Sequence, residues 1–87
     1  MNPSDLSTWL ENLKKAKTLI RETRTELEIA NESLCDNWNN LPLTQQQSDK
    51  GEELDAKISA TSEAIDLLID TTNALNAAIN CFYELQT

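Results

Sequence analysis

The residues best suited to chemistry in this sequence are carboxylates grouped along two helical stretches. Glu63, Asp66 and Asp70 share one helical face, and Glu22 and Glu26 share another. Paired carboxylates serve acid–base catalysis or bind a hard cation where they are partly buried or converge from several directions. Here they are expected on convex, solvated surfaces with no ligand-bearing loop opposite. We therefore expect an acidic surface and no catalytic or metal site.

The other common catalytic groups are absent or isolated. The sequence has no His, which removes the usual general base and the commonest metal ligand. Its single Gly excludes the glycine-rich loops that hold phosphates. Cys35 and Cys81 are too few for a disulfide framework or a structural zinc site. No catalytic residue, cofactor or metal is expected, and the sequence indicates a non-enzymatic protein.

The charge of the chain is acidic and unevenly spread. Fifteen acids against seven bases give a net charge of −8, and residues 44–87 alone carry eight acids and two bases. Direct binding to nucleic acid or to an anionic membrane is not expected, because both need a basic footprint. A basic protein surface is favoured as a partner instead. The acidic surface of the second half consists of Glu52, Glu53, Asp55, Glu63, Asp66 and Asp70.

Neither a secretory signal nor a membrane span is evident. Residues 1–5 contain no basic region followed by an apolar run. The most apolar stretch, residues 64–82, contains two Asp and three Asn. The sequence therefore predicts a cytoplasmic protein, with leaderless export left open.

One break divides the chain into two long helices. Pro42 cannot continue a helix. Asn2 before Pro3 is typical of a helix start, and Thr44 with Gln47 three residues later has the form of a capping box. The expected elements of a single domain, residues 1–87, are a helix over about 3–39, a turn over about 40–44 and a helix over about 45–85.

Both helices carry the apolar spacing of a coiled coil. In the first, one column is Leu6, Leu13, Ile20, Leu27 and Leu34, and a second column three residues later is Trp9, Ala16, Thr23 and Ala30. In the second, steps of four and three give Leu54, Ile58, Thr61, Ile65, Leu68, Thr72, Leu75, Ile79 and Phe82. The expected fold is all-α, an antiparallel two-helix hairpin of coiled-coil type.

The register follows if the hairpin folds about Pro42. Facing residues then have numbers that sum to about 84 or 85, so that Leu27 meets Ile58 and Thr23 meets Thr61 in a polar layer. Every core position of one helix meets a core position of the other, and this agreement supports the hairpin.

The second helix carries more apolar surface than one partner helix covers. A second stripe runs beside its core column, again in steps of four and three: Ala64, Leu67, Thr71, Ala74, Ala78, Cys81 and Leu85. Four residues of the first helix, Leu10, Leu19, Ile29 and Trp38, lie off its expected seam and could join this surface. Trp38 is the aromatic expected to contact a partner. Three possibilities stay open: a second copy that completes a homodimeric four-helix bundle, a different protein, or an amphipathic surface left exposed in solution.

The outline resembles two kinds of small helical hairpin. One is the family of secreted proteins named for a Trp-X-Gly motif near the turn; this chain has Trp38-Asn39-Asn40 there, without the Gly, and Thr87 where the family's export signal has an acid. The other is the chaperones of type III secretion needles, which mask a helix of their partner. The resemblance covers topology and, for the first family, one Trp.

The sequence thus predicts a small acidic protein-binding module of adaptor, chaperone or inhibitor type that acts through the second stripe. The alternative is an acidic inhibitor encoded by a phage or mobile element, similar to anti-CRISPR or antirestriction proteins, that blocks a basic nucleic-acid-binding surface of a host protein. The charge of residues 44–87 motivates this alternative.

Overall fold

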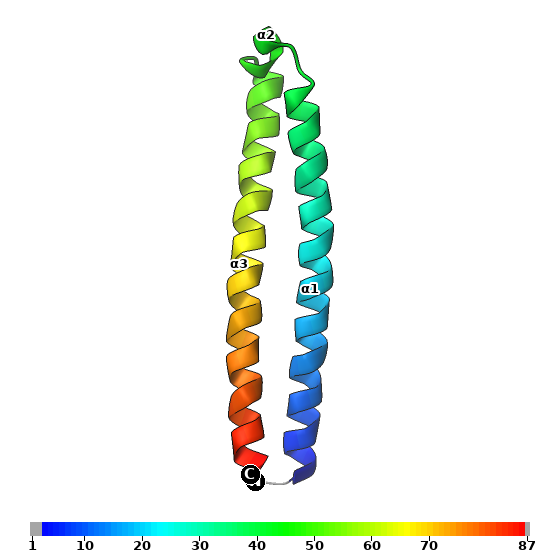
Figure 1. Ribbon diagram of the computed structural model, residues 1–87, viewed down its shortest axis with the longest axis vertical. Helices are drawn as coiled ribbons and strands as arrows, with labels where there is room; N and C mark the ends of the chain where they lie inside the picture. The colour runs from blue at the N-terminus through cyan, green and yellow to red at the C-terminus, as the bar shows by residue number, and fades with distance from the viewer. Residues whose placement is uncertain (1–2, 87) are drawn as a thin grey trace.

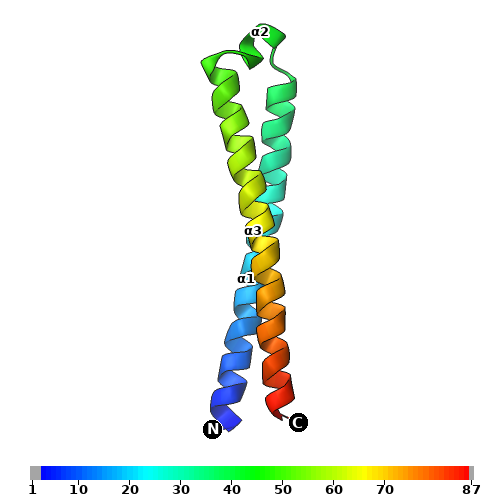
Figure 2. The same ribbon diagram turned by 90° about the vertical axis from the view of Figure 1, so that its left-hand side faces the viewer.

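The computed structural model is an antiparallel helical hairpin. It describes residues 3–86, with side chains from Asp5 to Leu85; Asn2 and Thr87 lie outside the described residues. Two long helices, α1 (Pro3–Asn39) and α3 (Asp49–Gln86), lie side by side, and a short helix, α2 (Leu43–Gln46), joins them at one end (Figure 1). The start of α1 and the end of α3 lie at the other end of the rod (Figure 2). Residues 3–86 contain no strand, so the all-α hairpin is confirmed.

The hairpin is a rod, 64 Å long and 15 by 14 Å across between Cα atoms. α1 contains no Gly, and its Pro stands at the first described helical position, where the missing N–H costs no hydrogen bond. The helices cross near the middle of the rod in the view of Figure 2, as helices of a coiled coil do.

The turn is built differently from the expected capping box. Pro42 precedes α2 with ψ of 151°, no side chain caps α2, and Thr44 lies inside it. The second long helix therefore begins at Asp49 and not near residue 45. The side-chain amide of Gln46 donates to the carbonyl oxygens of Trp38 and Leu41, at 3.1 Å each, and so ties α2 to the end of α1.

Gly51 lies where α2 folds back on the first turn of α3. A Cβ atom at this buried position would collide with the carbonyl group of Gln46 and would lie 2.6 Å from the carbonyl oxygen of Gln45. The absence of a side chain allows this close approach of two backbones.

The seam between the long helices agrees with the prediction in α3 and in the first column of α1, but not in the second column of α1. All nine expected core residues of α3 are buried or half-buried, as is the first column of α1. The second column of α1 was predicted one residue too early, since Trp9, Thr23 and Ala30 are exposed. The residues that occupy it are Leu10, Lys17, Arg24, Asn31 and Trp38. Their larger side chains cover more of α3 than Ala or Thr could, and the stems of Lys and Arg can lie on apolar surface while their charges reach water.

The register also differs from the prediction. The amide of Asn31 donates to the Thr61 hydroxyl at 2.6 Å, to the Ile58 carbonyl oxygen at 3.1 Å and to the Ser62 hydroxyl at 3.1 Å. The numbers of Asn31 and Thr61 sum to 92, about one heptad more than expected. The physical reason is the turn: α2 and its flanking residues lengthen the connection, so the chain reverses near residue 46.

The predicted layer of Thr23 and Thr61 is therefore wrong. The hydroxyl of Thr23 donates to the carbonyl oxygen of Leu19, one turn earlier in the same helix, at 2.9 Å. Thr61 is the residue that meets Asn31, and its own hydroxyl also donates within α3. The polar layer of the seam is thus an Asn–Thr pair.

Candidate functional site

The seam divides the surface of the hairpin into two sides. Successive residues of a helix are about 100° apart, so those one place before a seam residue lie on one flank, and those one place after lie on the other. Because the helices are antiparallel and both right-handed, the flanks that precede the seam share one side of the hairpin. The contact of Lys14 with Tyr83, each one place after a seam residue, is consistent with this for the opposite side.

The predicted stripe of α3 lies on the flank that precedes the seam. Leu67, Thr71, Ala74, Cys81 and Leu85 are exposed; Ala64 and Ala78, closest to α1, are half-buried. On the same side α1 presents Trp9, Ala16, Leu19, Thr23 and Ala30. We call these twelve residues together the apolar side.

The largest side chains of the apolar side are open to solvent. Leu19, Leu67 and Leu85 expose 63, 57 and 59% of their surface. Trp9 is exposed at the open end, with its ring centroid 6.3 Å from that of Phe82. Most of these α1 residues were predicted to lie in the core. The sequence does contain a signal for the correct column: Leu10 and Trp38, two large apolar residues, lie in the column that follows the predicted one by one residue.

Trp38 and Leu10 are not part of this surface, contrary to the prediction. Both belong to the seam: Leu10 is buried and Trp38 half-buried. The Nε1 atom of Trp38 is itself buried, with no acceptor among the described residues. Trp38 therefore serves the contact between the helices. Ile29 is exposed but lies on the outer face of α1, two places from the nearest seam residues.

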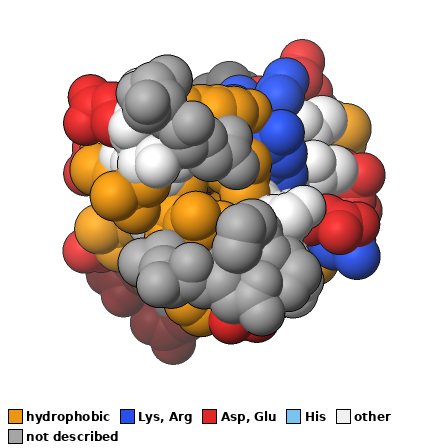
Figure 3. Space-filling view, turned by 90° about the horizontal axis from the view of Figure 1, so that it is seen from below, with side chains coloured by type: hydrophobic (Ala, Val, Ile, Leu, Met, Phe, Trp, Pro, Cys, Tyr) orange, Lys and Arg blue, Asp and Glu red, His pale blue; other side chains and the backbone are white. Residues whose placement is uncertain are grey.

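Charge is nearly absent from the apolar side. The flank positions from Trp9 to Ser33 in α1 and from Ala60 to Leu85 in α3 include one charged residue, Glu26. From the open end, hydrophobic side chains cover the centre and left of the visible surface, and most visible Lys and Arg side chains form one group right of centre (Figure 3).

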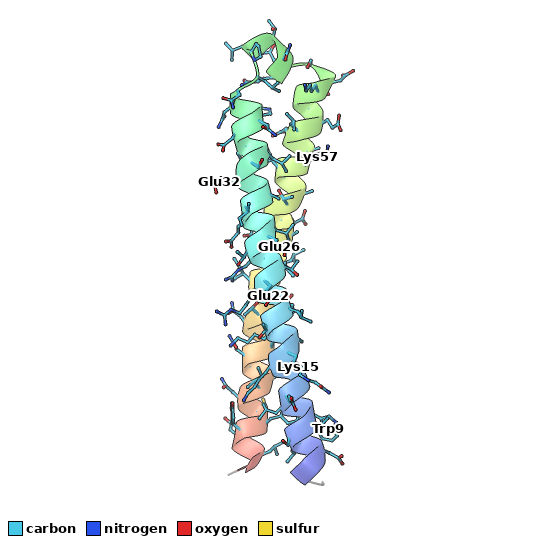
Figure 4. All side chains as sticks on the ribbon, turned by 90° about the vertical axis from the view of Figure 1, so that its right-hand side faces the viewer. Trp9, Lys15, Glu22, Glu26, Glu32 and Lys57 are labelled. Carbon is cyan, nitrogen blue, oxygen red and sulfur yellow. The ribbon has the colours of Figure 1, made fainter. Side chains whose placement is uncertain are left out.

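Apart from Glu26 and, nearer the turn, Glu53, the acidic residues named above occupy other faces. All six predicted residues of the acidic surface are exposed, namely Glu52, Glu53, Asp55, Glu63, Asp66 and Asp70. Glu53 pairs with Lys57 at 3.2 Å. The side chains of Glu22 and Glu32 project from the outside of α1 (Figure 4). No group of three or more Cys, Asp or Glu side chains in the described residues is arranged to hold a metal ion.

Two further features bear on the chemistry of the chain. Cys35 and Cys81 are both free thiols, the first half-buried and the second exposed on the apolar side. Within residues 3–86, no helix has a stretch that is long and apolar enough to cross a membrane.

Comparison with known proteins adds no family. No protein-family model matches the chain, and no curated protein or solved structure shows significant similarity to it. The functional interpretation therefore depends on the surface of the hairpin.

Proposed function

We propose that this chain is a non-enzymatic protein-binding module, and that the apolar side binds a second copy to complete a four-helix bundle. The observation that carries the proposal is a surface of small and apolar residues, nearly free of charge, on a chain with 22 charged residues in 87. Ala and Thr at the inner positions permit close approach of helices, and Leu19 and Leu67 provide larger side chains that can insert between them.

The large solvent-accessible surface of a single hairpin supports the proposal that a partner covers part of it. The chain has a surface of 6225 Å², whereas a compact monomer of its mass exposes roughly 5,200 Å². The surplus, about 1,000 Å², is of the size that one partner contributes to a standard interface. Leu10 and Ile79 are the buried hydrophobic residues among those described, which is a small core for an isolated domain.

The charge distribution favours a second copy as that partner. Two molecules with a net charge of −8 repel each other most where their carboxylates meet. The apolar side is the surface on which copies can approach with the least repulsion. A basic partner would instead be expected to contact the acidic residues.

The solution mass tests the proposal directly. Light scattering on a sizing column is expected to give twice the 9.8 kDa of the chain at concentrations of ~10 to ~100 µM. Leu67→Glu and Ala74→Glu each place a charge in the interface and should give helical monomers. Asn73→Glu adds the same charge one residue away, at an exposed position outside the apolar side, and should stay dimeric.

Other results would contradict the proposed dimer or its interface. If both interface variants keep the wild-type mass, the apolar side is not the interface. A helical, monomeric wild type would contradict binding of a second copy; a photo-crosslinker at position 74, with position 73 as control, would then show whether a different protein covers this side. A dimer that dissociates as salt rises from ~0.1 to ~0.5 M would indicate that acids of one copy pair with cations of the other, and that the apolar side is not the main contact. The inhibitor alternative instead requires that binding of a basic protein weakens over the same range of salt.

The cellular setting belongs to the same proposal. Two free thiols suit a reducing compartment, so we propose that the protein acts in the cytoplasm.

A further inference from the structure

The opposite side of the hairpin contains a groove with a different chemistry. The groove has a volume of about 600 Å³ and lies between α1 and α3 toward the open end. α1 contributes Lys14, Lys17, Thr18 and Arg21, and α3 contributes Asn76, Ile79, Asn80 and Tyr83. Ile79 is buried at 7% exposure, so the groove has an apolar base and polar walls.

The charged residues that line this groove are all cations. Lys15, Arg24 and Lys57, which do not line it, each pair with an acid four residues away, at 3.5, 3.5 and 3.2 Å. No ion pair joins Lys14, Lys17 or Arg21 to a carboxylate in the part of the chain that the structure describes. The groove is therefore a concentrated positive site on a protein of net charge −8.

The spacing of these cations is unfavourable for the hairpin alone. Lys14, Lys17 and Arg21 are separated by three and four residues, so each is the neighbour of the next on one face of α1. Like charges at these spacings destabilise a helix, whereas opposite charges stabilise it. An anionic ligand in the groove would relieve this repulsion.

The α3 wall adds neutral hydrogen-bond donors. The side-chain amides of Asn76 and Asn80 form no hydrogen bond within the described residues. Tyr83 contributes a phenol, and the Lys14 ammonium lies 5.3 Å from the centre of its ring, which restrains both side chains. Amides, a phenol and three cations together form a set that suits carboxylate oxygens.

We propose that this groove binds an acidic helical segment of another protein, with carboxylates at positions i, i+3 and i+7. The row from Lys14 to Arg21 extends about 10 Å along α1, too far for one small anion to meet all three cations. A helix with acids at the same spacing places three carboxylates along the same length. The groove lies across the seam from the apolar side, so this site is independent of the proposed dimer.

Side-chain amide resonances of the intact chain provide a local test. The ¹⁵N-labelled protein is titrated, in low salt, with an Ala-based helical peptide that carries Glu at i, i+3 and i+7. The side-chain amide signals of Asn76 and Asn80 are expected to shift and saturate. The corresponding signals of Asn12 and Asn73, which do not line the groove, should stay in place. These four Asn residues share a side-chain chemistry and differ in position.

Matched variants assign the binding to the cations. Arg21→Gln removes one exposed charge from the groove and should weaken peptide binding about tenfold, the effect of one charge-assisted contact. Lys15→Gln removes the same charge from a neighbouring position outside the groove and should change the affinity by less than about twofold.

Three results would overturn the proposal. An isomeric peptide with its Glu residues spread around the helix could bind as tightly, which would show attraction without recognition of spacing. Inorganic phosphate could give the same shifts with equal affinity, which would make this a simple oxyanion site. The absence of any saturable shift at Asn76 and Asn80 would exclude a site. None of these results would alter the solution mass on which the proposed dimer depends.

Discussion

Asn31 connects the two long helices more directly than any other side chain that the structure describes. Its amide reaches a backbone carbonyl and two hydroxyls of α3, and its carbonyl oxygen lies 3.7 Å from the thiol of Cys35. A buried polar residue in a coiled-coil seam lowers stability compared with an apolar one but selects a single alignment. Asn31 thus determines which residues of α3 lie opposite α1.

Asn31→Ala is expected to lower the free energy of unfolding by about 1–2 kcal/mol, because the Thr61 hydroxyl and the Ile58 carbonyl oxygen lose a hydrogen-bond partner in a half-buried position. Asn73→Ala is the control: Asn73 is exposed in mid-helix, so this change measures the gain in helix propensity alone. Urea denaturation followed by circular dichroism gives both values. Equal effects of the two substitutions would show that the Asn31 hydrogen bonds add nothing to stability.

Gly51 gives a second prediction at the scale of one residue. Ala is a better helix former than Gly by about 1 kcal/mol, so propensity alone predicts that Gly51→Ala stabilises α3. The structure predicts the reverse, a loss of about 1–3 kcal/mol, because the new Cβ meets the backbone of α2. Thermal unfolding of Gly51→Ala beside Ser59→Ala, a control at an exposed helical position, measures the difference. A rise in melting temperature for Gly51→Ala would contradict the packing of α2 on α3.

At the scale of the elements, the sequence predicted α3 better than α1. The seam of α3 consists of apolar residues and Thr, so hydrophobic spacing is sufficient to find it. The second column of α1 contains Lys17, Arg24 and Asn31, which hydrophobic spacing rejects. Lys17 and Arg24 have long stems that can lie on apolar surface, and Asn31 forms hydrogen bonds across the seam, so their place there depends on the partner helix. The hairpin was predictable, and this face of α1 was not.

The predicted register was wrong for a related reason. A coiled coil repeats every seven residues, so sliding one helix past the other by one heptad again places core residues on core residues. The agreement between the two seams therefore supports both alignments equally. The length of the turn and the Asn31–Thr61 contact choose between them, and the small helix α2 had no signal in the hydrophobic pattern.

Cross-linking distinguishes the two registers. Asn31→Cys with Thr61→Cys is expected to react rapidly with a short thiol-specific cross-linker, since these side chains are in contact. Asn31→Cys with Leu54→Cys pairs two positions that would face each other if facing residue numbers summed to 85, as the sequence predicted. This pair should react slowly, because Leu54 lies seven residues, or about 10 Å, from Thr61 along α3. Cys35→Ser and Cys81→Ser remove the native thiols from both proteins. Faster reaction of the pair with Leu54→Cys would show that the hairpin adopts the shorter turn.

At the scale of the whole molecule, the two proposals give the rod two binding sides that differ in the physics of binding. The proposed dimer would bury the small and apolar residues of the apolar side, and its affinity is expected to change little with salt. The proposed peptide site in the groove would act through three cations, so its affinity should fall as ions screen them. A hairpin can carry both because its seam leaves a flank on each side of both helices.

The independence of the two sides is testable with two variants and two readouts. Ala74→Glu should reduce the solution mass to that of one chain and leave the peptide-induced shifts of Asn76 and Asn80 intact. Arg21→Gln should weaken those shifts and leave the mass of the dimer unchanged. Raising the salt from ~0.05 to ~0.5 M, where the Debye length falls to a few ångströms, should suppress the shifts in wild type and preserve its dimer. If Arg21→Gln also dissociates the dimer, or if high salt abolishes both readouts together, the cationic groove is itself part of the contact between copies, and the rod has one interface and not two.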